Sequence, residues 1–369
     1  MKTLEELCKK ESSSIAQKDL DGNEGEYPIY GASGFIKNVD FYTQDKPYIA
    51  VVKDGAGVGR VMKLPAKSSV IGTMQYIIPN EDINTDFLAY ALENMNLAKY
   101  YTGATIPHIY FKDYCKEQLP VYSMEEQSRI AFVLNKASFI IECRKKQLSK
   151  LDELVKARFV ELFGDPYSND KNWMVDTLGN YMTTLTDFSA NGSYELLDSN
   201  VVMYDEPNYA IMVRTTDLES GDLSSGVKYI DESAYELLSK SKLFGGELIM
   251  NKIGSAGKIY IMPYIDHPAS LGRNAFMFRF DDRLNMKYLY FLLTSDYGTK
   301  EIQQYVRGAV TKTITKESTR AIKIIVPPIE LQNQFSAFVE QTDKSKLEVQ
   351  KSLEKLELLK KALMQKYFG

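Results

Sequence analysis

Cysteine and histidine are scarce in this sequence, which limits the metal and disulfide chemistry that it can support. The 369 residues include only three cysteines and two histidines. Cys8, Cys115 and Cys143 are odd in number and scattered along the chain, so we expect no disulfide framework. Because His108 and His267 are the only imidazoles, a zinc site has almost no ligands to draw on. We therefore expect no metal site in this chain.

Long apolar runs are missing as well. No stretch of about 18 apolar residues occurs, so the sequence predicts no transmembrane helix. The first residues, MKTLEELCKKESSS, have no apolar core of the signal-peptide type. Apolar residues make up 44% of the chain and charged residues 25%, which is ordinary for a soluble globular protein. We therefore expect a cytoplasmic protein with room for two or three domains.

The sequence also lacks the common catalytic motifs. It has no H-E-x-x-H zinc motif and no G-x-S-x-G nucleophile elbow. DGAGVG (54–59) suggests a nucleotide-binding turn, but the following RVMKL is typical of a strand and not of the helix that such a site needs. IGSAGK (253–258) lacks the spacing of a phosphate-binding loop. A tight hairpin is the simpler interpretation of DGAGVG, and the missing motifs favour a binding protein over an enzyme.

Basic residues are not in excess, but they gather in two places. The formal net charge is −4, which argues mildly against extensive coating of nucleic acid. Residues 53–67 nevertheless contain four basic side chains against Asp54 alone, and residues 307–323 contain five against Glu317 alone. An ordinary solvated surface would explain either cluster by itself equally well.

The chain contains an internal repeat. A step of 205 residues carries RFVELFG (158–164) onto LMQKYFG (363–369), and VYSMEEQSRIAFVLNK (121–136) onto VPPIELQNQFSAFVEQ (326–341). The same step carries Gly103 onto Gly308 and Ile109 onto Ile314. In the glycine-rich stretches the step falls to about 200, so the two copies have diverged by insertion.

Each copy ends in a stretch whose apolar residues recur every seven positions, which is typical of a coiled coil. Neither stretch has an interior proline or glycine, and each predicts a helix of about 38 residues, or roughly 57 Å. The residues expected in the apolar seam are Leu134, Ile141, Leu148, Leu151, Val155, Leu162, Val339, Val349, Leu353, Leu356 and Leu363.

Charged residues interrupt this seam at complementary places. Under the 205-residue step each one falls on an apolar residue: Arg144 on Val349, Arg158 on Leu363, Lys346 on Ile141 and Lys360 on Val155. Two copies of one helix would bring like charges together, whereas the two different helices would not, so we infer an intramolecular pair. Alternatively, these long side chains reach out of a hydrated seam into solvent.

The other two segments mix strand and helix patterns. KPYIAVVKDGAGVGRVMKL (46–64) and GELIMNKIGSAGKIYIMP (246–263) each predict two strands around a glycine-rich loop. DFLAYALENMNLAKYY (86–101) and MKYLYFLLTSDYGTKEIQQYV (286–306) predict amphipathic helices, and GDPYSNDKNW (164–173) predicts a turn-rich junction. The predicted fold class is α+β: a globular α/β domain over 1–120, a long helix over 121–164, a second α/β domain over 165–325 and a second long helix over 326–369.

Basic, polar and aromatic residues near the glycine turns are the candidates for binding. Loops on a rigid scaffold carry recognition residues, and these side-chain types contact base edges and phosphates. The candidates in the first copy are Tyr27, Tyr30, Lys53, Arg60, Lys63, Gln75, Tyr76 and His108, and those in the second are Lys252, Lys258, Arg273, Asn274 and Lys312. For any one tyrosine, packing in the core is the commoner role.

Over its whole length the sequence resembles the specificity (S) subunit of type I DNA restriction–modification systems. In the first copy the resemblance rests on YPIYGASGFI (27–36), KDGAGVGRV (53–61), GATIPHIYFKDY (103–114), VYSMEEQSRIA (121–131) and ARFVELFGDP (157–166). In the second it rests on IGSAGKIYIM (253–262), GAVTKTITKES (308–318), VPPIELQNQFSAFV (326–339) and LMQKYFG (363–369). Tyr122 and Ser123 replace the usual Pro-Pro, while the glutamine and the heptads that follow are kept.

The resemblance implies two target recognition domains, each reading one half of a split, asymmetric site in double-stranded DNA. It implies that the two long helices pack antiparallel, with pseudo-two-fold symmetry, as a spacer that sets the gap between the half-sites. It also implies that two modification subunits bring the S-adenosylmethionine chemistry, and that two restriction subunits are an optional addition that brings ATP and Mg²⁺. The S subunit itself is then non-catalytic and binds no cofactor.

Two other functions stay open on the residues alone. A coiled-coil adaptor that binds other proteins would show no salt-dependent affinity for DNA, because counterion release accompanies DNA binding. A self-sufficient DNA enzyme would bind S-adenosylmethionine or a metal ion by itself.

Overall fold

The computed structural model describes residues 1–103 and 107–369. The chain divides into two compact units, unit 1 formed by residues 1–149 with 347–369 and unit 2 formed by residues 150–346. The four predicted segments separate domains from helices, whereas each compact unit combines one domain with a part of both long helices. This difference arises because each domain packs against both helices, as described below.

Unit 1 contains a four-stranded sheet in the order β2-β8-β5-β6, a three-stranded sheet in the order β4-β3-β7, and the short pair β1-β9. β5 (YIAVV) lies inside the larger sheet and is buried at every position, which suits its β-branched and apolar side chains. The strands are β1 Lys2–Thr3, β2 Cys8–Ser12, β3 Tyr27–Gly31, β4 Gly34–Val39, β5 Tyr48–Val52, β6 Val61–Leu64, β7 Ser69–Val70, β8 Met74–Pro79 and β9 Gln118–Leu119. The short helices are α1 Leu4–Leu7, α2 Thr85–Asn94 and α3 Phe111–Tyr114.

Unit 2 repeats this plan and enlarges it. Its sheets have the orders β11-β18-β15-β16, β13-β12-β17-β14 and β10-β19. The strands are β10 Met174–Thr177, β11 Met182–Asp187, β12 Ala210–Val213, β13 Lys228–Ile230, β14 Lys242–Leu243, β15 Leu248–Asn251, β16 Ile259–Ile261, β17 Ala269–Leu271, β18 Ala275–Phe280 and β19 Lys323–Val326. The short helices are α5 Tyr194–Asn200, α6 Thr215–Ser220, α7 Glu232–Leu237, α8 Met286–Thr294, α9 Asp296–Gln303 and α10 Lys316–Arg320.

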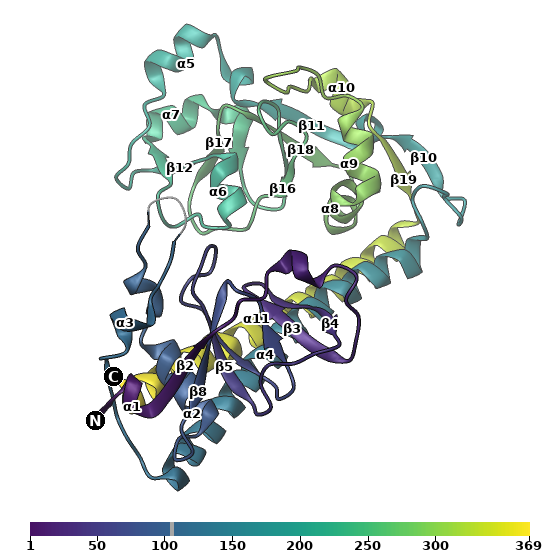
Figure 1. The fold of residues 1–369 in the computed structure, drawn as a ribbon. Coiled ribbons are helices and arrows are strands. Elements are labelled where there is room, and N and C mark those ends of the chain that lie inside the picture. Colours follow the sequence, from purple (N-terminus) through teal and green to yellow (C-terminus); the bar gives the residue numbers. More distant parts are fainter. Residues whose placement is uncertain (104–106) are drawn as a thin grey trace. The chain divides into compact units, whose positions relative to one another are not determined.

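The two units share one strand topology, as the internal repeat requires. The order β2-β8-β5-β6 corresponds to β11-β18-β15-β16, and the parallel pair β3-β7 corresponds to the parallel pair β12-β17. The main difference lies between β11 and β15, where unit 2 carries α5, α6 and α7 (Figure 1). The predicted α/β domains and the predicted strand pairs around both glycine-rich loops are therefore confirmed.

Two of the predicted helices are interrupted. The helix expected over 86–101 ends at Asn94, because Asn96 adopts a left-handed conformation (φ 50°) before a 3₁₀ turn over Leu97–Tyr100. The helix expected over 286–306 is two helices, α8 and α9, with Ser295 between them. The Ser295 hydroxyl accepts a hydrogen bond from Gly298 N (3.2 Å), so this serine starts a new helix.

The two long helices are α4 Met124–Phe163 and α11 Ile329–Phe368. They pack antiparallel within each unit. In unit 1 the Tyr122 hydroxyl, just before α4, donates to Tyr367 O (3.1 Å) and Lys145 pairs with Glu357 (2.8 Å) further along. In unit 2 Lys346 pairs with Asp152 (2.5 Å), and α4 ends beside the start of α11. The predicted antiparallel pair of helices is thereby confirmed.

The predicted seam residues all face inward. Leu134, Val155, Val339, Val349 and Leu353 are buried. The others are half-buried: Ile141, Leu148, Leu151, Leu162, Leu356 and Leu363. The seam is therefore buried at some heptad positions and half-buried at others, so its dry core is interrupted along its length.

The charged seam residues reach polar partners at the edge of the seam. Lys346 bonds Asp152 and Lys360 lies 3.8 Å from Glu93. Arg158 pairs with Glu161 (2.8 Å), and its guanidinium carbon lies 5.8 Å from the Phe338 ring centroid. Both inferences from the sequence hold at once, because the helices pair within the chain and their long cations extend outward.

A buried glutamine joins each domain to its long helix in the same way. In unit 1 Gln127 Oε1 accepts from Asn84 N (2.9 Å), and its Nε2 donates to Tyr122 O and Asp82 O (3.0 and 3.2 Å). Asn84 is the N-cap of α2, so the glutamine links the starts of two helices.

In unit 2 Gln332 Oε1 accepts from Asn285 N (2.8 Å), and its Nε2 donates to Pro327 O and Arg283 O (2.8 and 3.2 Å). Asn285 is likewise the N-cap of α8. Aromatic packing surrounds this junction, since Phe335 of α11 meets Phe159 and Phe163 of α4. Among the described residues, no helix combines the length and apolar character that a membrane crossing needs.

We expect Gln332→Ala to destabilise unit 2, because the buried Asn285 N–H and Pro327 carbonyl lose their partner. Each buried polar group left unpaired costs about 1–3 kcal/mol. Urea unfolding followed by tryptophan fluorescence would measure the loss, since Trp173, the single tryptophan, lies in unit 2. Gln334→Ala, on an exposed position of the same helix, is the matched control. Equal midpoints for the two variants would contradict the role of Gln332.

Candidate nucleic-acid interface

The glycine-rich turn of unit 1, residues 53–60, is held by backbone hydrogen bonds to the segment 102–109. Gly55 N donates to Pro107 O (2.9 Å), and Ile109 N donates to Lys53 O (2.9 Å). Thr102 and His108 exchange two further bonds (2.8 and 2.9 Å). We call this arrangement the loop pair of unit 1. Residues 104–106, inside the stretch 103–114 singled out above, lie outside the described residues.

Unit 2 has an equivalent loop pair, formed by residues 252–258 and 307–314. Gly254 N donates to Lys312 O (2.9 Å), and Ile314 N donates to Lys252 O (3.1 Å). Arg307 and Thr313 exchange two bonds (2.9 and 2.7 Å). The backbone contacts are those of unit 1, but the side chains differ, since Arg307 and Lys312 stand where unit 1 has Thr102 and Pro107. The two loop pairs therefore share a frame and carry different chemistry.

The glycines of DGAGVG serve a tight turn and not a phosphate-binding helix. β5 and β6 pair antiparallel on either side of the turn, which confirms the hairpin interpretation. Gly59 has φ +83°, and a Cβ there would lie 2.4 Å from Ala98 N. Only glycine combines that conformation with so close a neighbour.

Charged groups meet at the loop pair of unit 1. The His108 ring contacts the Asp54 carboxylate directly and lies 4.1 Å from the Tyr110 ring, centroid to centroid. Lys53 Nζ lies 3.8 Å from the same carboxylate. Lys53, Asp54 and His108 are all half-buried, so the structure brings two of the predicted candidates together around one acid that the prediction did not include.

The corresponding cluster in unit 2 is stronger. Asp187, the last residue of β11, is 6% exposed and accepts hydrogen bonds from Lys252 Nζ (2.6 Å) and Lys316 Nζ (2.9 Å). Both ammonium groups also lie near the Phe276 ring, 5.7 and 5.9 Å from its centroid. Two cations facing one buried anion leave a net positive charge at this end of the sheet.

The pKa of the Asp187 carboxyl reflects two opposed effects. Burial would raise this pKa, because a charged carboxylate loses hydration. The hydrogen bonds and charges of Lys252 and Lys316 outweigh burial, so the pKa is lowered overall. The carboxylate therefore stays ionised and keeps both lysines in place.

Lys258 and Arg60 are exposed and Arg273 is half-buried, and all three make only weak local contacts. Lys258 contacts Glu219, Arg273 lies 3.2 Å from Asp198, and Arg60 Nη1 donates to Ala32 O (2.8 Å). Exposed ion pairs contribute little to stability, so these cations can exchange their partners for a phosphate at small cost. Lys312 is exposed as well.

Two candidates are buried in the core of unit 1 and a third faces the helices. Gln75 and Tyr76 are each 1% exposed, because β8 is an inner strand of its sheet. Gln75 Nε2 bonds the Tyr114 hydroxyl, and the Tyr76 hydroxyl accepts from Val70 N (3.1 Å), so both belong to the core. Lys63 bonds Asn135 (2.6 Å) on α4 and pairs with Asp86 (3.1 Å) on α2, which ties it to the helices.

Tyr27 and Tyr30 are half-buried against neighbouring aromatic rings. Tyr27 lies 4.7 Å from Tyr42 and Tyr30 lies 6.0 Å from Phe35, centroid to centroid. This placement agrees with the packing role expected of most tyrosines.

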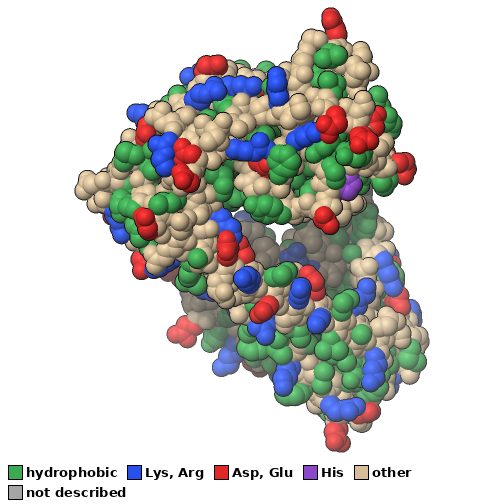
Figure 2. Space-filling view, turned by 180° about the vertical axis from the view of Figure 1, so that it is seen from behind, with side chains coloured by type: hydrophobic (Ala, Val, Ile, Leu, Met, Phe, Trp, Pro, Cys, Tyr) green, Lys and Arg blue, Asp and Glu red, His purple; other side chains and the backbone are tan. Residues whose placement is uncertain are grey.

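Sequence reasoning missed Asp187 and Lys316. Lys316 lies in the basic stretch 307–323 and could have been chosen from it. Asp187 carries no local signal, because its two lysine partners are 65 and 129 residues away in the chain. The face seen in Figure 2 carries Lys and Arg interspersed with Asp and Glu, which agrees with the small net charge. Within residues 1–103 and 107–369, no three His, Cys, Asp or Glu side chains are grouped to hold a metal ion.

A duplicated domain that repeats one loop frame with different side chains, joined by paired helices, defines a protein with two distinct recognition surfaces. Comparison with known proteins identifies its kind. The family model described as the type I restriction modification DNA specificity domain matches residues 1–153 and 180–358. The chain therefore belongs to this family: it is a DNA-binding specificity subunit and not itself catalytic.

The relatives agree in sequence and in fold. The specificity subunit of the type I restriction enzyme MjaVIII from Methanocaldococcus jannaschii is 24% identical over 362 residues, covering 92% of this chain and 85% of that protein. The MjaIX specificity subunit from the same organism is 23% identical over 317 residues, covering 79% and 69%. The crystal structure of a type I restriction–modification S subunit from M. genitalium superposes with a TM-score of 0.62 at 17% identity, covering 100% of this chain and 95% of that one.

We expect Asp187→Asn to destabilise unit 2 by about 1.5–3 kcal/mol at neutral pH, because two charge-assisted hydrogen bonds are weakened. A carboxyl whose pKa is lowered in the folded state stabilises above its unfolded pKa, and that stability is lost as pH falls through the folded pKa. Urea unfolding between pH 7 and pH 3 should therefore show the wild type and the variant converging at the acidic end. Asp282→Asn, at an exposed position of unit 2, is the control. A constant difference across this range would contradict the assignment.

We expect Lys258→Ala to weaken DNA binding while leaving folding intact, since the one charged partner that Lys258 has among the described residues is the exposed Glu219. Loss of one phosphate contact should reduce the slope of log affinity against log salt by about one. Fluorescence anisotropy with duplex DNA at several salt concentrations measures both quantities. Lys240→Ala, an exposed lysine that lies in neither loop pair, is the control, and an unchanged salt slope for Lys258→Ala would remove it from the interface.

Proposed function

We propose that the two units read the two halves of a split DNA site, each through its own loop pair. The observation that carries this proposal is that one backbone frame recurs in both units with different side chains on it. Two units with the same backbone frame can dock on DNA in the same orientation, whereas their different side chains select different bases. The half-sites are then unlike, and the whole site is asymmetric.

The paired helices act as the spacer between the half-sites. A helix of 40 residues is about 60 Å long at 1.5 Å per residue. Half-sites about one helical turn of DNA apart, roughly 34–36 Å, fall within this length. The length of the gap in the DNA site follows from the length of α4 and α11.

The partners we propose are two modification subunits, one for each unit. Each unit has a groove at an equivalent place, between the end of α2 or α8 and the end of a long helix. The groove of unit 1 includes Glu93, Asn94, Lys361, Met364 and Gln365, and that of unit 2 includes Thr294, Ser295, Lys156, Phe159 and Val160. The 205-residue step carries Lys156, Phe159 and Val160 onto Lys361, Met364 and Gln365. Equivalent grooves suit two copies of one partner.

An exposed apolar pair on α4 also favours a partner on the helices. Phe132 and Phe139 are 67% and 66% exposed and lie seven residues apart on one face. Exposed aromatic residues at this spacing are typical of a helix that a partner covers. S-adenosylmethionine, ATP and Mg²⁺ belong to the partners in this proposal, restriction subunits are an optional addition, and the complex acts in the cytoplasm on genomic DNA.

Mapping of methylated adenine across the host genome, with and without this gene, tests the proposal. We expect one split motif with a fixed gap to lose methylation on deletion. If no motif changes while the modification subunits are expressed and bind S-adenosylmethionine, the proposed function is wrong.

Inserting one heptad into each long helix, after Ser149 and after Lys346, should lengthen the gap. Seven residues add about 10 Å and keep the seam in register, which corresponds to about three base pairs at 3.4 Å each. Methylation mapping of the variant complex reads the new gap directly. Both half-site sequences should stay the same and serve as the internal control. An unchanged gap would refute the spacer role of the helices.

A further inference from the structure

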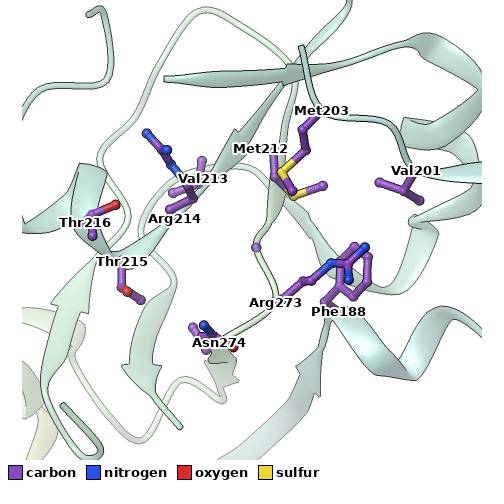
Figure 3. Close-up of a pocket in the computed structure, with 12 residues that line it drawn as sticks. Phe188, Val201, Met203, Met212, Val213, Arg214, Thr215, Thr216, Arg273 and Asn274 are labelled. Atoms are coloured by element: carbon purple, nitrogen blue, oxygen red, sulfur yellow. The ribbon is translucent and has the colours of Figure 1, made fainter. Parts of the chain in front are cut away.

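A cavity of about 280 Å³ opens in unit 2 between β12 and the turn that joins β17 to β18. One side is apolar and is formed by Phe188, Val201, Met203 and Met212 (Figure 3). The other side is polar and is formed mainly by Arg214, Thr215, Thr216 and Asn274, while Arg273 lies over the Phe188 ring. Apolar and hydrogen-bonding surfaces thus face one small space.

The polar residues differ in how firmly they are held. Arg214 is fixed, because its guanidinium bonds Asp217 (2.6 Å) and Gly226 O (2.7 Å). Arg273 is more loosely held, since it stacks over the Phe188 ring at 5.1 Å and pairs with the exposed Asp198 at 3.2 Å.

Asn274 combines a fixed backbone with an exposed side chain. Its carbonyl accepts from Lys252 N (2.9 Å), which ties the turn to the loop pair. Gly272, two residues earlier, lets the turn approach β12, because a Cβ there would lie 2.8 Å from Val213 O. No hydrogen bond of the Asn274 amide occurs within the described part of the chain, so the amide is presented on a rigid turn and available for binding.

A second cavity of about 280 Å³ shares Phe188, Arg273 and Asn274 with the first and adds Lys252. The β17–β18 turn therefore stands between two hollows, with the cation cluster around Asp187 adjoining it through Lys252. A polyanion that reached Asn274 would meet Arg273 and Lys252 on the way, so the charges at this place complement a nucleic-acid backbone.

Part of the cavity's lining belongs to a segment of unit 2 that unit 1 lacks, while β12 and the β17–β18 turn have counterparts in unit 1. Phe188, Val201 and Met203 come from the segment between β11 and β12 that includes α5, and Arg214–Thr216 begin at the end of β12 and enter α6. If two repeats on one frame read different half-sites, the difference must be encoded where the repeats differ. This cavity is such a place.

We propose that the cavity reads one A·T base pair of the half-site bound by unit 2. In the major groove adenine presents an acceptor (N7) beside a donor (N6), which an asparagine amide can bond with both of its ends, and thymine presents a methyl group. Asn274 bonds the adenine, and the thymine methyl of the same pair enters the apolar side formed by Met203, Met212 and Val201. A G·C pair offers neither the donor–acceptor pattern nor the methyl group. This inference rests on the proposed function and names residues that set its specificity.

The test uses the complex with its modification subunits and a duplex that carries the methylated motif found by mapping. Each thymine of both half-sites is replaced in turn by deoxyuridine, which removes only the methyl group. We expect one thymine, in one half-site, to lower affinity by about threefold to fivefold, the effect of burying one methyl group. If no thymine of either half-site responds, the inference is wrong.

The variant Asn274→Ala then locates the contact independently. We expect the variant complex to methylate sites with other bases at one position of the motif, because its discrimination against those bases falls about tenfold or more. That position should be the base pair found by the deoxyuridine scan. In the Asn274→Ala complex, deoxyuridine at that position should lower the affinity for DNA by less than it does in the wild type. Asn180→Ala, an exposed asparagine of unit 2 that lines neither cavity, is the control and should retain the wild-type motif.

The outcomes separate this inference from the proposed function. If Asn274→Ala loses base specificity at a position other than the deoxyuridine-sensitive one, or at no position, the cavity does not read that base pair. The wild-type split motif would still support the proposed function. If the wild-type complex has no split motif at all, the proposed function fails first, and the inference falls with it.

Discussion

The buried glutamine at the start of each long helix is the contact on which the rest of the architecture depends. Gln127 and Gln332 each bond one backbone N–H and two backbone carbonyls, and each reaches the N-cap of the helix in its own domain. A buried amide with all these partners fixes distance and direction, because any rotation of the domain on its helix would break several bonds at once. A recognition surface carried by a spacer needs this rigidity, since the spacing of two loop pairs has meaning only if each is fixed to its helix.

In the proposed function, duplication explains how one scaffold would recognise two unlike sequences. The loop pairs keep the same backbone bonds, from Gly55 to Pro107 and from Gly254 to Lys312. Around that frame the side chains change: His108 contacts Asp54 in one unit, whereas Lys252 and Lys316 share Asp187 in the other. The larger change is the segment with α5, α6 and α7, which forms the cavity beside Asn274. The shared backbone bonds and the differing side chains thus belong to different residues, so the side chains can diverge while the fold remains.

The helices combine a weakly packed seam with charges that keep the pairing within the chain. The helix pair is buried where its own aromatic residues Phe159, Phe163 and Phe335 join the core of unit 2, and half-buried near Leu148 and Leu356. Lys346 and Lys360 leave the seam and form ion pairs with carboxylates at its edge. Helices in proteins gain most of their stability from tertiary packing, so the residues of each unit that pack on α4 and α11 stabilise the helix pair.

The sequence by itself determined the features that are local or periodic. The 205-residue repeat, the heptads and the hairpins around both glycine turns all follow from patterns within short stretches, and the resemblance to a known family rested on such stretches. Only the tertiary structure decided which candidate residues reach the surface. Gln75 and Tyr76 have side chains of the types that often contact DNA, but their strand lies inside a sheet. The order of strands in a sheet is set by contacts between residues that are distant in the sequence. Asp187, Lys252 and Lys316 meet for the same reason, because burial and ion pairing depend on which segments the fold brings together.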